Sequence, residues 1–193
     1  MGGVSTSAVA GDGSELTRKQ QHDPVQWMRF FWEQQSDEDP SGFLAMTSLL
    51  RLHHLMRNTL DHQLRTTFEI SLTDFQILKA LQLSDTGTWV LSRMAWHLMV
   101  HATTVTLSID RLEAKQLVTR HSHPHDRRAS LVTITDDGRD VADDATRSLR
   151  QYEFGLPGLT ASQARALTAT VARVRASAGD VDRSYGSTPR DVG

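Results

Sequence analysis

Residues 105–138 constrain the fold of this chain more strongly than any other segment. The segment begins with a stretch of helical periodicity and continues as two short runs in which apolar and polar residues alternate, LVTRH at 117–121 and SLVTIT at 130–135. Apolar positions three and four apart predict a helix, and strict alternation over about four to eight residues predicts a strand. The segment therefore predicts a helix, a two-stranded hairpin and the start of a further helix.

The helix predicted at residues 102–116 has two different faces. Its core face lies within a narrow arc and is formed by Val105, Ile109 and Leu112. Its outer face consists of short hydroxyl side chains and a few others: Thr103, Thr104, Leu107, Asp110 and Arg111, with Thr106 on the flank. Hydroxyls can bond to base edges or phosphates, and a leucine can contact a thymine methyl group in the major groove. An ordinary surface helix would look similar, so the helix alone leaves both interpretations open.

The turn between the predicted strands favours the DNA-binding interpretation. Its sequence, HSHPHDRR at 121–128, is basic, and Arg127 and Arg128 would project from it. The narrow minor groove attracts arginine because its potential is negative. We expect Asp126 to pair with Arg111 or a neighbouring arginine and to fix the turn against the helix. We also expect Asp110 to bind an arginine of the hairpin that these strands and their turn form, called the wing below.

Positive charge is local rather than general. The formal net charge is −2, yet residues 111–128 hold five Arg and Lys against two acids, whereas residues 1–50 hold three against seven. This distribution indicates that one local basic segment contacts DNA phosphates, rather than that the whole surface binds nucleic acid.

Composition and helix-start signals predict the organisation of the chain. Residues 1–22 and 179–193 are expected to be disordered tails. Helices for dimerisation are expected at 23–70 and 136–178, on either side of a central DNA-binding domain at 71–135. The first of them opens at Pro24, and a long helix follows from about Phe43 to Arg65. Residues 84–88 (SDTGT) are expected to form a loop.

Local side-chain signals predict where three helices begin. Capping boxes are expected at Thr73 with Gln76 and at Thr160 with Gln163. Thr135, which precedes two aspartates, is expected to start a helix because carboxylates favour its positive end.

Several function classes find no support in the sequence. The chain has no cysteine, no Gly-x-Ser-x-Gly motif and no glycine-rich phosphate loop, so we expect no enzyme activity and no cofactor. No apolar run approaches the ~18 residues that cross a bilayer. We therefore expect a cytoplasmic protein without a membrane partner.

The histidines of the turn suggest an alternative. His121, His123 and His125 alternate ahead of Asp126, and imidazole suits zinc, nickel or copper. Pro124 interrupts the run, and a turn tip offers few groups to orient the ligands. We therefore predict no metal site, and a metal-responsive regulator that uses these histidines stays as an alternative.

The order of motifs resembles the MarR family of bacterial transcriptional regulators over roughly residues 43–176. The motifs are LTDFQILKAL (72–81), LSRMAWHLMV (91–100), TTVTLSIDRLEAKQLVTR (103–120), DRR (126–128) and LVTITDDGR (131–139). The resemblance implies a mainly α winged helix-turn-helix with a small β-wing, in an intertwined helical homodimer. It also implies binding to a palindromic operator, usually as a repressor, often with release by a small aromatic ligand.

The resemblance also assigns residues. It places Thr103, Thr104, Thr106 and Arg111 on the recognition helix, and Asp126 and Arg128 on the aspartate and arginine of the wing. Family members usually have glycine where this chain has Met99 and Gln116, and a Ser or Asp cap where it has His101. If the backbone at either of these glycine positions is left-handed, a non-glycine residue there lowers the stability of the fold by roughly 1 kcal/mol.

Three residues are candidates for ligand binding. An N-terminal helix with tryptophans resembles a urate-responsive subgroup and suggests Trp27, although that subgroup has Asp where this chain has Gln76. His53 is the best placed histidine of the long helix to line a pocket. Packing at a dimer interface is the favoured explanation for the tryptophans.

The combined prediction is a homodimeric, ligand-responsive repressor that binds double-stranded operator DNA. A winged-helix protein-interaction module without DNA binding is the second alternative.

Overall fold

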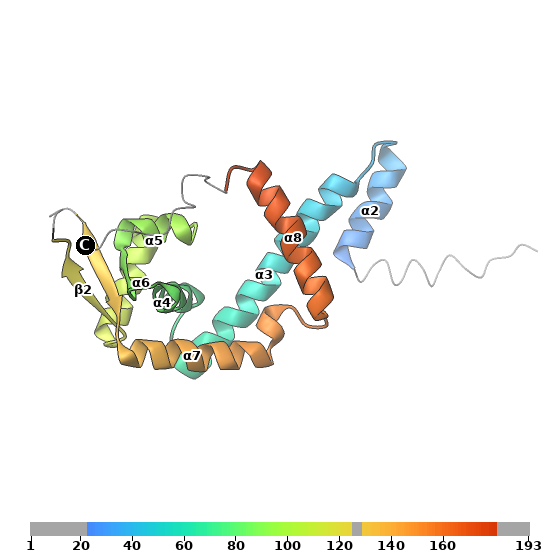
Figure 1. The fold of residues 1–193 in the computed structure, drawn as a ribbon. Coiled ribbons are helices and arrows are strands. Elements are labelled where there is room, and N and C mark those ends of the chain that lie inside the picture. The colour runs from blue at the N-terminus through green and yellow to red at the C-terminus, as the bar shows by residue number, and fades with distance from the viewer. Residues whose placement is uncertain (1–22, 125–128, 181–193) are drawn as a thin grey trace, which may run out of the picture. The chain divides into compact units, whose positions relative to one another are not determined.

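The computed structural model describes residues 23–124 and 129–180. The expected tail at 1–22, all but residues 179 and 180 of the expected tail at 179–193, and residues 125–128, with Asp126, Arg127 and Arg128, lie outside the described residues. The helices and strands follow one another along the chain as shown in Figure 1: α2 (Pro24–Gln35), α3 (Ser41–Phe68), α4 (Leu72–Leu83), β1 (Thr88–Val90), α5 (Leu91–His97), α6 (Ala102–Ala114), β2 (Val118–Ser122), β3 (Ser130–Ile134), α7 (Asp136–Gln151), a 3-10 turn (Glu153–Gly155) and α8 (Ala161–Ser177). The described residues form two compact units, which meet between Gln63 and Leu64 along the chain.

In the first unit, α2 folds back on the start of α3. The Asp23 carboxylate caps α2 by accepting a hydrogen bond from the backbone N–H of Val25, and Pro24 occupies the first turn, as predicted. The Trp32 ring stacks on Phe43 with centroids 5.1 Å apart, and its Nε1 donates to the Glu38 carbonyl. Trp32 thus fixes the corner between the two helices.

Apolar side chains of this unit remain exposed to solvent. They are Trp27, Phe30 and Phe31 on α2, and Met46, Leu49, Leu50 and Leu55 on α3. No residue of α2 is buried within the described chain. Helices that expose so many large apolar side chains are typical of a surface that packs against a further partner.

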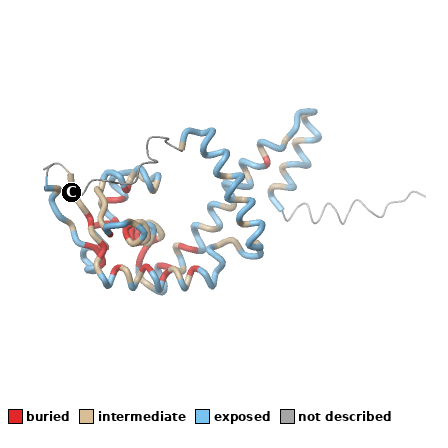
Figure 2. Tube along the Cα trace, viewed as in Figure 1, coloured by how far each residue is buried: buried red, intermediate tan, exposed pale blue. Residues whose placement is uncertain are grey.

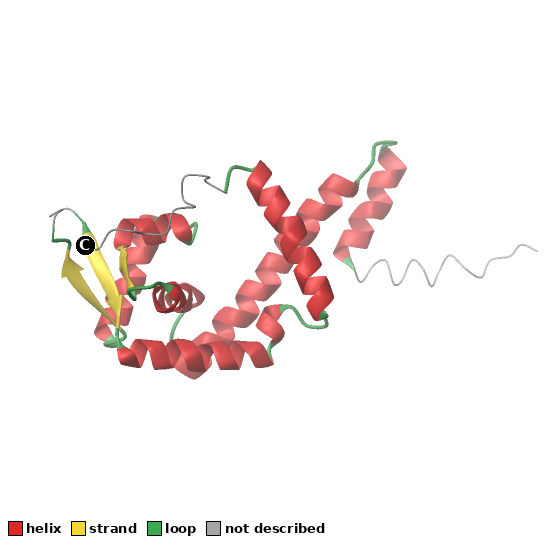
Figure 3. Ribbon diagram, viewed as in Figure 1, coloured by secondary structure: helices red, strands yellow, loops and turns green. Residues whose placement is uncertain are grey.

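The second unit contains a three-stranded antiparallel sheet of order β1-β3-β2 (Figure 3). Val118 pairs with Ile134 and Thr88 with Thr133. The two predicted strands are confirmed. The loop expected at 84–88 ends one residue earlier, because Thr88 already belongs to β1. This strand was not predicted, since three residues are too few to show alternation.

The core of the second unit joins α4, α6, the sheet and α7. Ile77, Leu78 and Leu81 of α4, Val105, Ile109 and Leu112 of α6, and Val132 of β3 are all fully buried. Figure 2 shows the buried positions gathered on these elements, whereas α8 is largely exposed. The predicted core face of α6 is confirmed.

Two of the three predicted helix starts are confirmed. The Thr135 side chain accepts from the Gly138 amide, and Thr160 forms a capping box with Gln163. The box predicted at Thr73 and Gln76 is wrong. Ser71 is the N-cap of α4, and Asp74 is its third helical residue, so Thr73 already lies inside the first turn.

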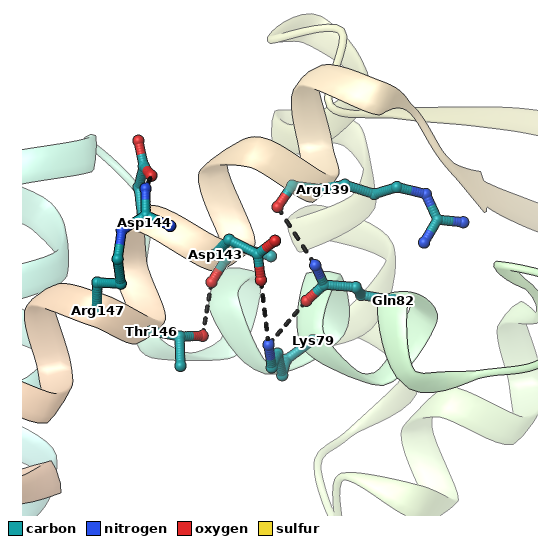
Figure 4. A network of polar contacts seen from close by, with 8 residues as sticks. Lys79, Gln82, Arg139, Asp143, Asp144, Thr146 and Arg147 are labelled. Atoms are coloured by element: carbon teal, nitrogen blue, oxygen red, sulfur yellow. Dashed lines mark hydrogen bonds and ion pairs between the residues drawn. The ribbon is translucent and has the colours of Figure 1, made fainter.

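Polar contacts attach α7 to α4 (Figure 4). Lys79 Nζ donates to Gln82 Oε1 at 2.8 Å and lies 3.6 Å from an oxygen of Asp143. Gln82 Nε2 donates at 3.4 Å to the carbonyl of Arg139. Beside these contacts, Ala142, Ala145 and Leu149 bury the inner face of α7.

The first turn of α7 lies directly against the start of β2. The Thr135 amide donates to the Leu117 carbonyl at 3.1 Å, and its hydroxyl donates to the Gln116 carbonyl at 2.9 Å. A Cβ at Gly138 would lie 2.1 Å from the Leu117 carbonyl oxygen and 2.9 Å from Ile134 Cγ1. Only glycine fits at this position.

We predict that Gly138→Ala lowers the free energy of unfolding by about 3 kcal/mol, because backbone must shift to make room. Urea unfolding followed by circular dichroism measures the change. Gly42→Ala is the matched control, since a Cβ there meets no atom within 4 Å. The control should raise stability by up to about 1 kcal/mol, as alanine favours helix. Equal stability of Gly138→Ala and the unchanged protein would contradict the close packing.

Candidate nucleic-acid interface

The helices α5 and α6 form a helix-turn-helix whose turn depends on a left-handed residue. Met99 has φ of 51°, and the Val100 amide donates to the Ala95 carbonyl at 3.1 Å. Gln116, after α6, is also left-handed, with φ of 60°. Both are positions where the family usually has glycine, and each non-glycine side chain in this left-handed backbone costs roughly 1 kcal/mol.

His101 caps the start of α6, as its position predicted. Its Nδ1 accepts from the Thr103 backbone N–H at 3.4 Å and lies 3.2 Å from the Thr103 hydroxyl. The cap helps to satisfy the unpaired amides of the first turn of α6.

The outer face of α6 is exposed as expected. Thr103, Thr104, Leu107, Asp110 and Arg111 are all exposed, while Thr106 is partly covered. The Thr106 hydroxyl donates to the Ala102 carbonyl at 3.2 Å within the helix. Leu107 exposes 54% of its surface.

Arg111 binds a buried carboxylate on α4. Its Nη2 donates to Asp74 Oδ1 at 2.8 Å and to the Ser108 hydroxyl at 2.9 Å, and its Nε donates to Asp74 Oδ2 at 3.4 Å. Asp74 is only 3% exposed and also accepts from the Ser71 amide at 2.9 Å. The contact of Arg111 with DNA stays a prediction, and Asp126, its expected partner, lies outside the described residues.

The hydrogen bonds around Asp74 determine its ionisation. Burial raises the pKa of its carboxyl, but the hydrogen bonds from Arg111, from Ser71 and from Ser108 together outweigh burial. The pKa therefore lies below its ordinary value, and Asp74 is a carboxylate that ties α4 to α6.

A second ion pair joins α6 to the wing. Arg120 of β2 donates through Nη2 to Asp110 at 2.5 Å, and its Nε lies 3.7 Å from Glu113. The sequence predicted that Asp110 holds a wing arginine. In the structure this arginine lies on the strand rather than in the turn.

The histidines of the wing form local contacts. His121 Nε2 lies 2.9 Å from the Thr119 hydroxyl. Among residues 23–124 and 129–180, no three His, Asp or Glu side chains lie close enough to hold a metal ion. His125 is not among these residues. His97 ends α5 and meets the Trp89 ring at 4.7 Å.

The three candidate ligand residues are exposed. The described ring contacts of Trp27 and His53 are with neighbours on their own helices, Phe31 at 4.6 Å and His54 at 5.7 Å. Gln76 lies exposed on α4. Their role in ligand binding stays a prediction.

Asp74 and Arg120 were not among the site residues predicted from the sequence. A signal for Asp74 was present, because Ser71-x-x-Asp74 also fits a capping pattern and starts two residues earlier than the pattern chosen. Arg120 alternates with apolar neighbours in β2. The sequence indicated only that it belongs to the basic segment 111–128, not that it binds a carboxylate.

A helix-turn-helix with an exposed outer helix face and a following β-wing defines a winged-helix DNA-binding protein. The family model described as MarR family matches residues 70–130. Sco5413 of Streptomyces coelicolor, a MarR family transcriptional regulator, is 31% identical, with 75% of this chain and 100% of that chain covered and a TM-score of 0.67. The chain belongs to the MarR family of transcriptional regulators.

Two further comparisons agree with this assignment. The uncharacterized HTH-type transcriptional regulator YhbI of Bacillus subtilis is 28% identical over 85 residues, which are 44% of this chain. The match spans 55% of that relative's length. Sco3205 of Streptomyces coelicolor, a MarR family regulator solved in complex with DNA, is 23% identical with 80% and 98% of the chains covered; its TM-score of 0.63 shows a shared fold.

Within the described part of the chain, no helix is both long enough and apolar enough to cross a membrane.

We predict that Asp74→Asn lowers the free energy of unfolding at pH 7 by about 2 kcal/mol, because charge-assisted hydrogen bonds to a buried group are lost. The folded-state pKa of Asp74 is depressed, so its contribution is present above the unfolded value of about 3.9 and is lost as pH falls through the folded value. Urea unfolding at pH 7 and pH 3 measures both effects.

The variant should lose less stability than the unchanged protein between the two pH values. Asp85→Asn is the control, since that carboxylate is exposed in the loop that follows α4 and should contribute little. An Asp74→Asn protein with unchanged stability at pH 7 would show that the contact between α4 and α6 is dispensable.

Proposed function

We propose that the protein is a homodimeric repressor that binds a palindromic operator and is released from it by a small aromatic ligand. The observation that carries the proposal is the exposed outer face of α6, which two ion pairs hold against α4 and β2. A helix held in this way presents its side chains as a rigid surface, as recognition in the major groove requires. Membership of the MarR family and the DNA complex of Sco3205 support the same function.

Each subunit contributes one recognition helix and one wing. In the proposed complex α6 enters the major groove, with Thr103, Thr104 and Leu107 facing the bases. Arg127 and Arg128, which follow β2, contact phosphates or the minor groove. A symmetric dimer places two such helices about one turn of DNA apart, so the operator has two inverted half-sites.

The second subunit covers the exposed apolar residues of the helices outside the winged helix. On α2 and α3 these residues include Trp27, Phe31, Leu49 and Leu50, and on α8 Val174 is 60% exposed. Burial of such side chains stabilises an obligate dimer, whose interface resembles a core divided in two.

The ligand is proposed to act through the dimer. Trp27, His53 and Gln76 are the candidates to contact it. A ligand that favours one spacing of the two recognition helices changes operator affinity, and the operator changes ligand affinity by the same factor. As a regulator of genes, the protein is expected to act in the cytoplasm.

We predict that Arg128→Ala weakens binding to a DNA fragment from upstream of the protein's own coding sequence by about tenfold or more. Loss of one phosphate contact in each subunit should also make the salt dependence of binding shallower. Fluorescence anisotropy at several salt concentrations measures both. Arg150→Ala, which removes an exposed charge on α7, is the control and should bind normally.

Unchanged affinity of Arg128→Ala would exclude the wing from DNA binding. If the unchanged protein showed no salt-dependent binding to any duplex, the protein-interaction module would replace the repressor as the proposed function.

We predict that the protein sediments as a dimer at micromolar concentration and that Leu50→Glu shifts it toward monomer, because a charge would enter the apolar contact. Analytical ultracentrifugation measures the mass. Leu83→Glu, at an even more exposed leucine on α4, should leave the dimer intact. A monomeric unchanged protein would refute the proposed architecture.

A further inference from the structure

The arginines next to the recognition helix are engaged by carboxylates. Two of the three nitrogens of the Arg111 guanidinium donate hydrogen bonds to Asp74 and Ser108. The Arg120 guanidinium binds Asp110 and lies beside Glu113. An arginine that donates two bonds to the O6 and N7 of guanine is the commonest specific contact in the major groove. To make that contact, Arg111 would have to leave the buried Asp74 carboxylate uncompensated, which is strongly unfavourable.

The hydroxyl groups of α6 are also partly occupied. The Thr106 hydroxyl donates to its own helix, and the Thr103 hydroxyl lies within hydrogen-bonding distance of His101. Leu107 is 54% exposed, and Thr104, which precedes it by three residues, is exposed too. Residues three apart on a helix are neighbours, so a leucine side chain and a threonine methyl form one small apolar surface in the middle of the outer face.

We propose that Leu107, with Thr104 beside it, recognises the C5 methyl group of thymine in each operator half-site. The inference rests on the proposed function, since it assumes that α6 enters the major groove. Thymine is the base that presents a methyl group there, and aliphatic side chains contact it favourably. Recognition by α6 then depends on methyl burial rather than on arginine–guanine pairs.

The test begins with selection of bound duplexes from a random pool of double-stranded DNA by the full-length protein. In a selected duplex, deoxyuridine replaces thymine one position at a time, symmetrically in both half-sites. Uracil pairs like thymine but lacks the methyl group. Burial of one methyl corresponds to about fourfold in affinity, so we expect a loss of roughly fifteenfold for the pair of substitutions at the contacted position.

Leu107→Ala supplies the second arm of the experiment. This variant should bind thymine and uracil duplexes equally at the contacted position, while its helical content and melting temperature stay unchanged because Leu107 is exposed. Leu83→Ala, at an exposed leucine on α4, should keep the full preference for thymine. Replacement of the guanines by 7-deazaguanine, which lacks N7, should change the affinity less than twofold.

The outcomes separate this inference from the proposed function. Selected duplexes that bind equally with uracil at every position would overturn the inference and leave DNA binding intact. A preference for thymine that persists in Leu107→Ala would assign it to another residue. A large loss with 7-deazaguanine would show that an arginine recognises guanine after all. A pool from which no duplex is retained would overturn the proposed function and the inference together.

Discussion

The Asp74 carboxylate is the contact on which the geometry of the winged helix depends. One of its oxygens accepts from the Ser71 amide and closes the capping box of α4, and both accept from Arg111 of α6. A carboxylate that is almost fully buried is stable as an anion only while these donors remain in place. The start of α4 and the last turn of the recognition helix are therefore fixed by a single ion, and neither can shift without exposing it.

The same ion determines what the recognition helix can offer to DNA. Because the Arg111 guanidinium is bound to Asp74 and Ser108, the outer face offers DNA mainly side chains with short reach. Specificity on such a face comes from shape and methyl contacts more than from charge, while affinity must come from contacts outside α6. The division between a weakly charged helix and a basic wing follows directly from the pairing of Arg111.

The sequence was most informative where the signal is local. The core face of α6 and the cap at Thr160 follow from spacing, and the structure confirms them. Met99 and Gln116 stand where relatives have glycine, and the structure gives both a left-handed backbone. The strand β1 was not predictable because it is held by pairing with β3, more than 40 residues further along the chain.

In the candidate interface, too, local features were predictable and contacts between residues distant in sequence were not. The exposed face of α6 was predicted in full, but the partner of Arg111 was sought in the wing, close in sequence. Asp74 lies 37 residues away, and no local pattern links a capping aspartate to a distant guanidinium. For Asp110, the kind of partner was predicted correctly and its place was not, because pairing of β2 with β3 directs Arg120 toward the helix.

The contact of Gly138 with the Leu117 carbonyl has a mechanical consequence. The Thr135 hydroxyl and amide bind the carbonyls of Gln116 and Leu117, and the missing side chain at Gly138 lets the two backbones touch. Two backbone segments in direct contact, with no side chain between them, have little room to move relative to each other. The first turn of α7 is therefore tied to the backbone that links α6 to β2, and a tilt of α7 is passed on to the start of the wing.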